Sequence, residues 1–135
     1  MQTEMKSVIQ PVESISSWKE ARLLITDYFE SPPVVLKIED SIIGTLGNFS
    51  ASTGKAKSKK TFNLCAIVSS ALTNSTVLNY TSFLPIGKHK ILYVDTEQSK
   101  FHCKRVLSRI LQLAGLPLNQ HPKNLEFLSL RGYAT

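Results

Sequence analysis

A short basic segment near the middle of the chain has the residue types that bind phosphate groups. Residues 54–61 read Gly-Lys-Ala-Lys-Ser-Lys-Lys-Thr, and they match the spacing G-x-x-x-x-G-K-[ST] at the first glycine, the lysine and the final hydroxyl residue. In such a loop, backbone N–H groups and the start of the next helix surround an anion. Lys60 would reach the β- and γ-phosphates, and Thr61 would hold Mg²⁺ through its hydroxyl. The pattern therefore predicts a nucleotide site.

The expected nucleotide-binding residues are contiguous in the chain: Gly54, Lys55, Ala56, Lys57, Ser58, Lys59, Lys60, Thr61 and Phe62. The segment departs from the pattern at Lys59, which replaces the second glycine. Its N–H can still donate, but glycine at that position tolerates backbone angles that lysine disfavours. A solvated, lysine-rich loop is the competing interpretation.

A second group of candidate residues is the run Val94-Asp95-Thr96-Glu97-Gln98 at the end of an apolar strand. Ligands of open α/β sheets bind at the carboxyl ends of the strands, so these carboxylates and the loop of residues 54–61 are expected to share one crevice. Glu97 could orient and deprotonate an attacking water, and Lys60 and Glu97 are the expected catalytic residues. Asp95 could help to place Mg²⁺ or brace the loop. The alternative is that Asp95 caps the strand end and Glu97 is a surface charge.

The composition is that of an ordinary globular protein. The chain has 135 residues, of which 42% are hydrophobic and 19% charged, with a net charge of +6. The basic excess favours an anionic partner without selecting one. No membrane span or secretory signal is evident in the sequence, which favours a cytoplasmic location and no membrane partner. Cys65 and Cys103 are expected to be core residues rather than a disulfide or a metal site.

The chain is expected to divide near residue 31. Residues 1–31 would form an arm followed by a short amphipathic helix, which starts with a capping box at Ser17 and Glu20 and ends before Pro32. Residues 32–135 would form part of a nucleotide-binding domain.

Strands and helices alternate in this second part, which predicts an α/β fold with a mainly parallel sheet and three layers. The expected strands are Val34–Ile38, residues 42–43 followed by Thr45–Ser50, Lys90–Val94 and Leu125–Leu130. The expected helices are Lys60–Leu72 and Ser99–Ala114. The last three strands are expected to be parallel neighbours, with Lys90–Val94 covered on both faces. Residues 39–41 are expected to form a turn and residues 73–88 a long surface loop, and Gly44 and Gly47 suggest a bend or a close backbone approach.

Together these motifs resemble the AAA-type, RecA-like P-loop ATPases of Bacteroidetes chromosomes and mobile elements. The resemblance is carried by residues 43–50, 54–62, 94–100 and 128–133 and covers about Pro32 to Thr135. In these relatives the second loop glycine is also commonly basic, and Glu97 matches the glutamate that activates water.

The resemblance implies ATP and Mg²⁺ as cofactors, an ATPase linked to DNA processing, and a ring or filament of identical subunits. Relatives continue into a further strand that ends in the Walker B aspartate, and nothing after Leu130 matches it. The chain is therefore expected to be the front part of the ATPase core, and its own ATP hydrolysis to be very slow or absent.

Two other functions remain open. The chain could be a nucleotide-binding remnant that does not hydrolyse ATP, or a basic nucleic-acid-binding module without a nucleotide site. The second is less favoured because few aromatic residues lie beside the lysines to stack on bases.

Overall fold

The computed structural model describes residues 18–55 and 59–133. Its contacts group the chain into two units, Met1–Ser31 and Pro32–Thr135. Within the described ranges, no helix combines the length and the apolar character needed to cross a membrane.

The described part of the first unit, residues 18–31, does not show the amphipathic helix expected there. Helical geometry covers only Trp18–Glu20, and every described residue of this unit is exposed; Ser17 lies outside the described residues. The backbone N–H of Leu24 instead donates to the Asp27 carboxylate at 2.8 Å, which closes a local turn. A short helix is marginal unless its apolar face packs on another element, and this unit offers its apolar face no partner among the described residues.

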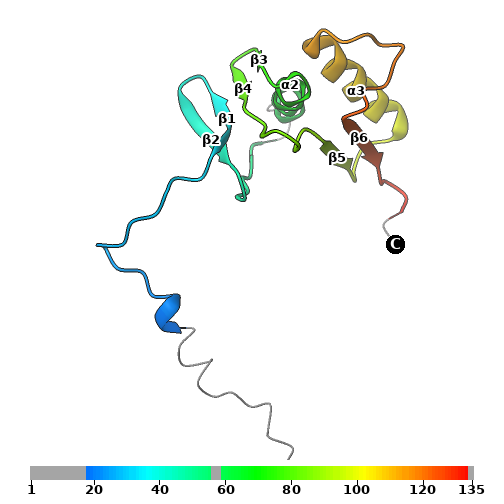
Figure 1. The fold of residues 1–135 in the computed structure, drawn as a ribbon. Helices are drawn as coiled ribbons and strands as arrows, with labels where there is room; N and C mark the ends of the chain where they lie inside the picture. Colours follow the sequence, from blue (N-terminus) through cyan, green and yellow to red (C-terminus); the bar gives the residue numbers. More distant parts are fainter. Residues whose placement is uncertain (1–17, 56–58, 134–135) are drawn as a thin grey trace, which may run out of the picture. The chain divides into compact units, whose positions relative to one another are not determined.

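The second unit holds the regular structure (Figure 1). Its elements follow one another as β1 (Val34–Ile38), β2 (Ser41–Thr45), α2 (Lys60–Thr73), β3 (Thr76–Val77), β4 (Tyr80–Ser82), β5 (Ile91–Asp95), α3 (Lys100–Ala114) and β6 (Leu125–Ser129). The fold is mixed α/β, with an antiparallel sheet in the order β2-β1-β4-β3 and a parallel pair, β5-β6.

The parallel pairing of β5 with β6 was expected, but the predicted strand Thr45–Ser50 is wrong. β2 ends at Thr45 and pairs antiparallel with β1. Beyond it, Gly47 has a φ of 81° and turns the chain away, so that residues 48–55 form no strand. Gly44 provides the close approach expected of it, because a Cβ there would lie 3.2 Å from the Cβ of Leu36.

The segment predicted as a long surface loop, residues 73–88, contains β3 and β4. β4 completes the antiparallel sheet by pairing with β1, with Leu36 opposite Ser82 and Ile38 opposite Tyr80. Sequence patterns miss such strands because β3 and β4 are two and three residues long. Their stability comes from pairing with a distant segment rather than from a local run of apolar residues.

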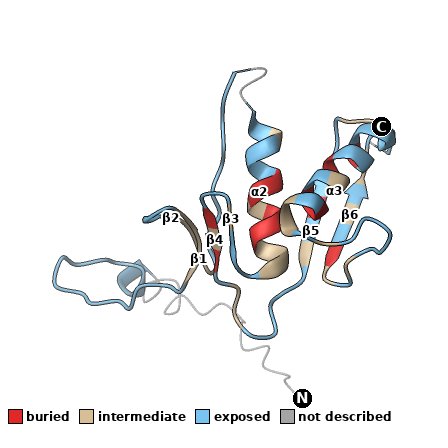
Figure 2. Cartoon of the chain, turned by 90° about the horizontal axis from the view of Figure 1, so that it is seen from above, coloured by how far each residue is buried: buried red, intermediate tan, exposed pale blue. Residues whose placement is uncertain are grey.

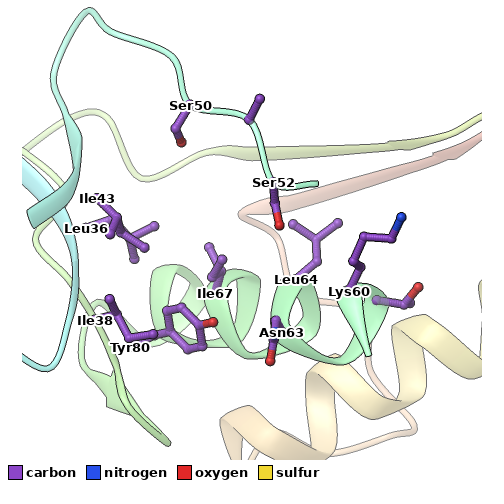
Figure 3. Close-up of a pocket in the computed structure, with 12 residues that line it drawn as sticks. Leu36, Ile38, Ile43, Ser50, Ser52, Lys60, Asn63, Leu64, Ile67 and Tyr80 are labelled. Carbon is purple, nitrogen blue, oxygen red and sulfur yellow. The ribbon is translucent and has the colours of Figure 1, made fainter. Parts of the chain in front are cut away.

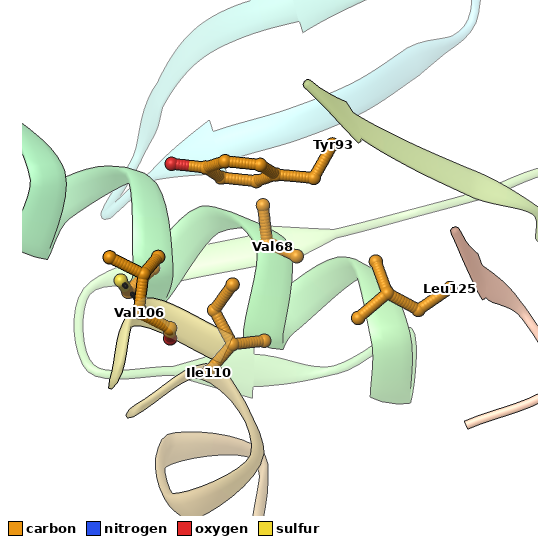
Figure 4. Packing of buried hydrophobic residues seen from close by; sticks show 6 residues of the cluster. Val68, Tyr93, Val106, Ile110 and Leu125 are labelled. Atoms are coloured by element: carbon orange, nitrogen blue, oxygen red, sulfur yellow. Dashed lines mark hydrogen bonds between the residues drawn. The ribbon is translucent and has the colours of Figure 1, made fainter. Parts of the chain in front are cut away.

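The two helices pack on each other through small side chains. Ser69 of α2 donates to the carbonyl of Ile110 in α3 at 2.8 Å, and the buried thiol of Cys65 faces the Val106 carbonyl. Both cysteines are buried and unpaired, as expected. The core combines these helices with the parallel strands: Figure 4 shows Val68, Val106 and Ile110 beneath the ring of Tyr93, with Leu125 beside them.

The helices cover one face of the β5-β6 pair. Tyr93 and Leu125 point into the core, whereas Leu92, Val94 and Leu128 on the opposite face are exposed. Figure 2 shows the same division, with buried residues on the sides of α2 and α3 that face each other and the strands. The expected coverage of Lys90–Val94 on both faces is therefore not found in the described residues.

Candidate functional site

The loop before α2 leads directly into the first turn of that helix. The Lys60 ammonium donates to the carbonyl of Gly54 at 2.8 Å, which brings the two ends of the loop together. No side chain caps the start of α2, and its first turn contains no acidic residue. The first N–H groups of a helix have no partner within the helix, so this helix start offers donors and a positive dipole to an anion.

The described nucleotide-binding candidates surround this helix start. Gly54, Lys55, Lys59, Lys60 and Phe62 are exposed, and Thr61 is half-buried in the first turn. The candidates Ala56, Lys57 and Ser58 lie outside the described residues.

Lys59 occupies the backbone conformation for which the pattern uses glycine. Its φ of 59° and ψ of 22° are left-handed, a region that costs a residue with a Cβ roughly 1–2 kcal/mol. The position therefore has a backbone conformation that favours glycine while it carries a basic side chain.

A pocket of about 430 Å³ lies beside this helix start. Figure 3 shows Lys60 at one end of it and the apolar side chains of Ile38 and Tyr80 towards the other, with Ser50 and Ser52 across from the helix. Thr61 and Asn63 also line it. Ligand pockets of this size combine apolar walls with a few polar groups that fix orientation, and here the polar groups gather at the loop.

The second predicted region forms a tight turn organised by Asp95. This carboxylate is buried, and its Oδ1 accepts hydrogen bonds from the backbone N–H of Glu97 at 2.9 Å and of Gln98 at 2.7 Å. Its Oδ2 accepts from the side-chain amide of Gln98 at 2.9 Å. These partners all belong to the turn after β5, so the structure shows Asp95 as the cap of the strand end, which was the alternative considered for it.

Glu97 and Asp95 have different environments although only one residue separates them. The side chain of Glu97 is exposed, while its backbone is tied to Asp95. An exposed carboxylate can accept a proton from water, but its position is not fixed by burial. Glu97 could therefore orient a water molecule only if a bound ligand fixed the position of its side chain.

The described residues contain no group of three or more His, Cys, Asp or Glu side chains that could hold a metal. Nucleotide-bound Mg²⁺ needs no such cage, since one or two protein ligands suffice when phosphates and water supply the rest. Thr61, in the first turn of α2, fits that role. Asp95 fits it less well because both of its oxygens already accept hydrogen bonds.

Sequence reasoning missed a basic group on α3. His102, Arg105 and Arg109 line a cavity together with Thr61 and Gln98. They are spaced three and four residues apart, which places them on one helix face. That spacing was available in the sequence, but only the structure shows that the face lies beside the first turn of α2.

Comparisons of the chain with protein-family models, with curated proteins and with solved structures found no match.

Proposed function

We propose that this chain binds ATP with Mg²⁺ through residues 54–61 and the first turn of α2. The observation that carries the proposal is the start of α2, which has no side-chain cap and no acidic residue and follows a basic loop that Lys60 closes onto Gly54. Phosphate groups bind at such helix starts because the N–H groups and the helix dipole act on the same anion. The pocket beside Lys60 gives room for the rest of a nucleotide.

In this proposal each residue has a separate task. Lys60 releases the Gly54 carbonyl and turns its ammonium towards the β- and γ-phosphates. Thr61 offers its hydroxyl to Mg²⁺, which when bound neutralises phosphate charge. Glu97 would orient the water for hydrolysis. The RecA-like, three-layer αβα fold, the link to DNA processing and assembly into a ring or filament belong to the same proposal and rest on the resemblance alone.

A second candidate is a nucleotide-binding module that does not hydrolyse ATP. It is favoured by the Asp95 turn, in which both carboxylate oxygens hold the chain's own donors. In this alternative, Asp95 and Glu97 have structural and surface roles, and the site at α2 only binds.

The test of binding is a titration of the full chain with Mg-ATP. Replacing Lys60 removes a charged contact worth roughly 1.5–3 kcal/mol, so Lys60→Ala should weaken binding about tenfold to more than a hundredfold. Lys55→Ala is the matched control: Lys55 lies in the same loop, is exposed and carries the same charge, and its loss should matter far less. Equal losses for the two variants would indicate diffuse attraction and contradict the proposal.

Steady-state ATPase assays separate the two candidates. If the chain turns over ATP, Glu97→Gln should leave ATP affinity nearly unchanged and reduce turnover sharply, because it keeps the size of the side chain but removes the base. Binding without turnover would support the second candidate. ATP-independent binding of DNA at low salt, with no ATP affinity, would favour a basic nucleic-acid-binding module.

A further inference from the structure

The cavity between α3 and the first turn of α2 is the strongest unassigned site in the described part of the chain. It has a volume of about 310 Å³ and is lined by Thr61, Gln98, His102, Arg105, Val106 and Arg109. No described lining residue is acidic. Its walls therefore combine hydrogen-bond donors with cationic groups, which is the chemistry that recognises oxyanions.

The charge on this face is not balanced within its own helix. α3 contains Lys100, Lys104, Arg105 and Arg109 and no aspartate or glutamate. Arg105 and Arg109 are four residues apart, and like charges at this spacing destabilise a helix slightly. Helix stability therefore does not explain why Arg105 and Arg109 lie next to each other. A bound anion would offset the repulsion between their charges.

The basic side chains that line the cavity have hydrogen-bond donors available for a ligand. The Nδ1 of His102 is paired with the Ser99 hydroxyl at 2.9 Å, so its Nε2 is on the opposite side of the ring. Arg109 lies close to α2, where its guanidinium opposes the rise that burial causes in the pKa of the Cys65 thiol. Arg105 is exposed along the same face. Guanidinium groups bind phosphate through paired N–H donors, a geometry that lysine does not offer.

We propose that His102, Arg105 and Arg109, together with the Thr61 hydroxyl, form a binding site for a phosphate group in the cavity between α2 and α3. The site does not require the nucleotide function proposed above. The phosphate is either the terminal group of a nucleotide whose other phosphates lie on the loop, or a group that belongs to a separate molecule.

The probe is inorganic pyrophosphate, titrated into the full chain by calorimetry, with the side-chain N–H signals of the arginines and of His102 followed by NMR. Arg105→Gln should weaken pyrophosphate binding about tenfold or more, the loss expected for a charged contact. Lys104→Gln is the matched control, because it removes the same charge from the same helix outside the cavity, and we expect less than about a twofold change from it.

Arg105 is exposed, so its replacement should leave the fold intact. His102 is also exposed, so His102→Gln provides a second variant that should keep the fold. Arg109 lies beside the buried Cys65, so the binding result for Arg109→Gln has to be combined with a measurement of its folding. Unchanged pyrophosphate binding in Arg105→Gln and His102→Gln would overturn the proposal. So would a loss in Lys104→Gln equal to that in Arg105→Gln, since it would show a diffuse basic surface.

Two variants, Arg105→Gln and Lys60→Ala, identify the source of the phosphate. If the site takes the terminal phosphate of a nucleotide, Arg105→Gln should weaken ATP more than ADP. If it takes a separate phosphate group, pyrophosphate should bind equally well to Lys60→Ala and alongside ATP. Either result supports the site. If the nucleotide proposal fails, Lys60→Ala will not change the affinity for ATP. The loss of pyrophosphate affinity in Arg105→Gln would still be observed, so the two failures can be told apart.

Discussion

The two helices of the second unit start in contrasting ways. α3 begins after a turn in which Asp95 accepts from two backbone N–H groups, and Ser99 caps the helix by accepting from the N–H of His102. α2 begins after Lys59 in a left-handed conformation, with no side-chain cap and no acidic residue in its first turn. One helix start thus has its own side-chain acceptors, and the other has none among the described residues.

This difference separates a structural turn from the turn at which we propose binding. A carboxylate that holds the chain's own N–H groups stabilises the fold and is poorly placed to serve a ligand as well. Helix donors without a partner inside the protein must be solvated or bind an anion. Carboxylates at a strand end and a basic loop at a helix start can look equally functional in a sequence, and their hydrogen-bond partners distinguish them.

The largest expected effect comes from removing the acceptor at the α3 start. Asp95→Ala leaves the N–H groups of Glu97 and Gln98 without their partner, and we expect the free energy of unfolding to fall by about 3 kcal/mol, since hydrogen bonds to a charged group contribute roughly 1.5–3 kcal/mol each and are not additive. Urea denaturation measures the change. Glu97→Gln, at an exposed site, should shift stability by less than about 0.5 kcal/mol. Similar values for the two variants would remove the distinction between a bracing and a surface carboxylate.

The next effect is a dependence of stability on pH that originates next to this turn. Burial is the largest cause that raises the pKa of Tyr93 from 10.0 to about 12, and the thiol of Cys65 and the Asp95 carboxylate add to it. The fold favours the neutral form of Tyr93. Its contribution to the free energy of unfolding is therefore complete below pH 10 and is lost as the pH rises through about 12.

We expect the free energy of unfolding to fall by about 2 kcal/mol across this window. Tyr93→Phe should remove this part of the fall, and Asp95→Asn should make it smaller. Equal pH profiles for wild type and Tyr93→Phe would show that Tyr93 is not the group responsible.

A smaller effect compares the two N-cap positions directly. Ser99→Ala removes the side-chain acceptor at the start of α3, and loss of a cap typically costs about 1 kcal/mol. Lys59→Ala, at the N-cap of α2, should change the free energy of unfolding by less than about 0.5 kcal/mol because the side chain of Lys59 caps nothing. Thermal unfolding of both variants checks the comparison, which fails if the two lose equal stability.

The smallest expected effect is that of Lys59→Gly, at the strained residue before α2. Glycine adopts a φ of 59° without the Cβ penalty, although its freedom in the unfolded chain offsets part of the gain. Lys59→Gly should therefore raise the free energy of unfolding by about 0.5 kcal/mol, and Lys59→Val should lower it by about 1 kcal/mol or more. Chemical denaturation of the pair measures the difference. A stabilising valine would mean that the left-handed conformation is not held in solution.

Much of the fold could be predicted from local patterns. β5 and β6 are apolar runs, α3 has a serine cap and ends at Gly115, and α2 was predicted to within one residue at its end. The errors arose where non-local pairing decides the structure: residues 46–50 form no strand, and β4 gains its partner from β1, far away in the chain. Apolar periodicity records which residues prefer burial, but not which segment will cover them.

For the candidate site, the sequence by itself determined the chemistry: a basic loop ending in Lys60 and Thr61, the carboxylates Asp95 and Glu97, and a helix whose charges are all positive. Residue types and their spacing are local properties. The turn after β5 is local as well, because Asp95 accepts hydrogen bonds from residues two and three further on in the chain. Only the tertiary structure decided that Arg105 and Arg109 line a cavity with Thr61. That cavity depends on the packing of α2 against α3, which brings together groups that are distant in the sequence.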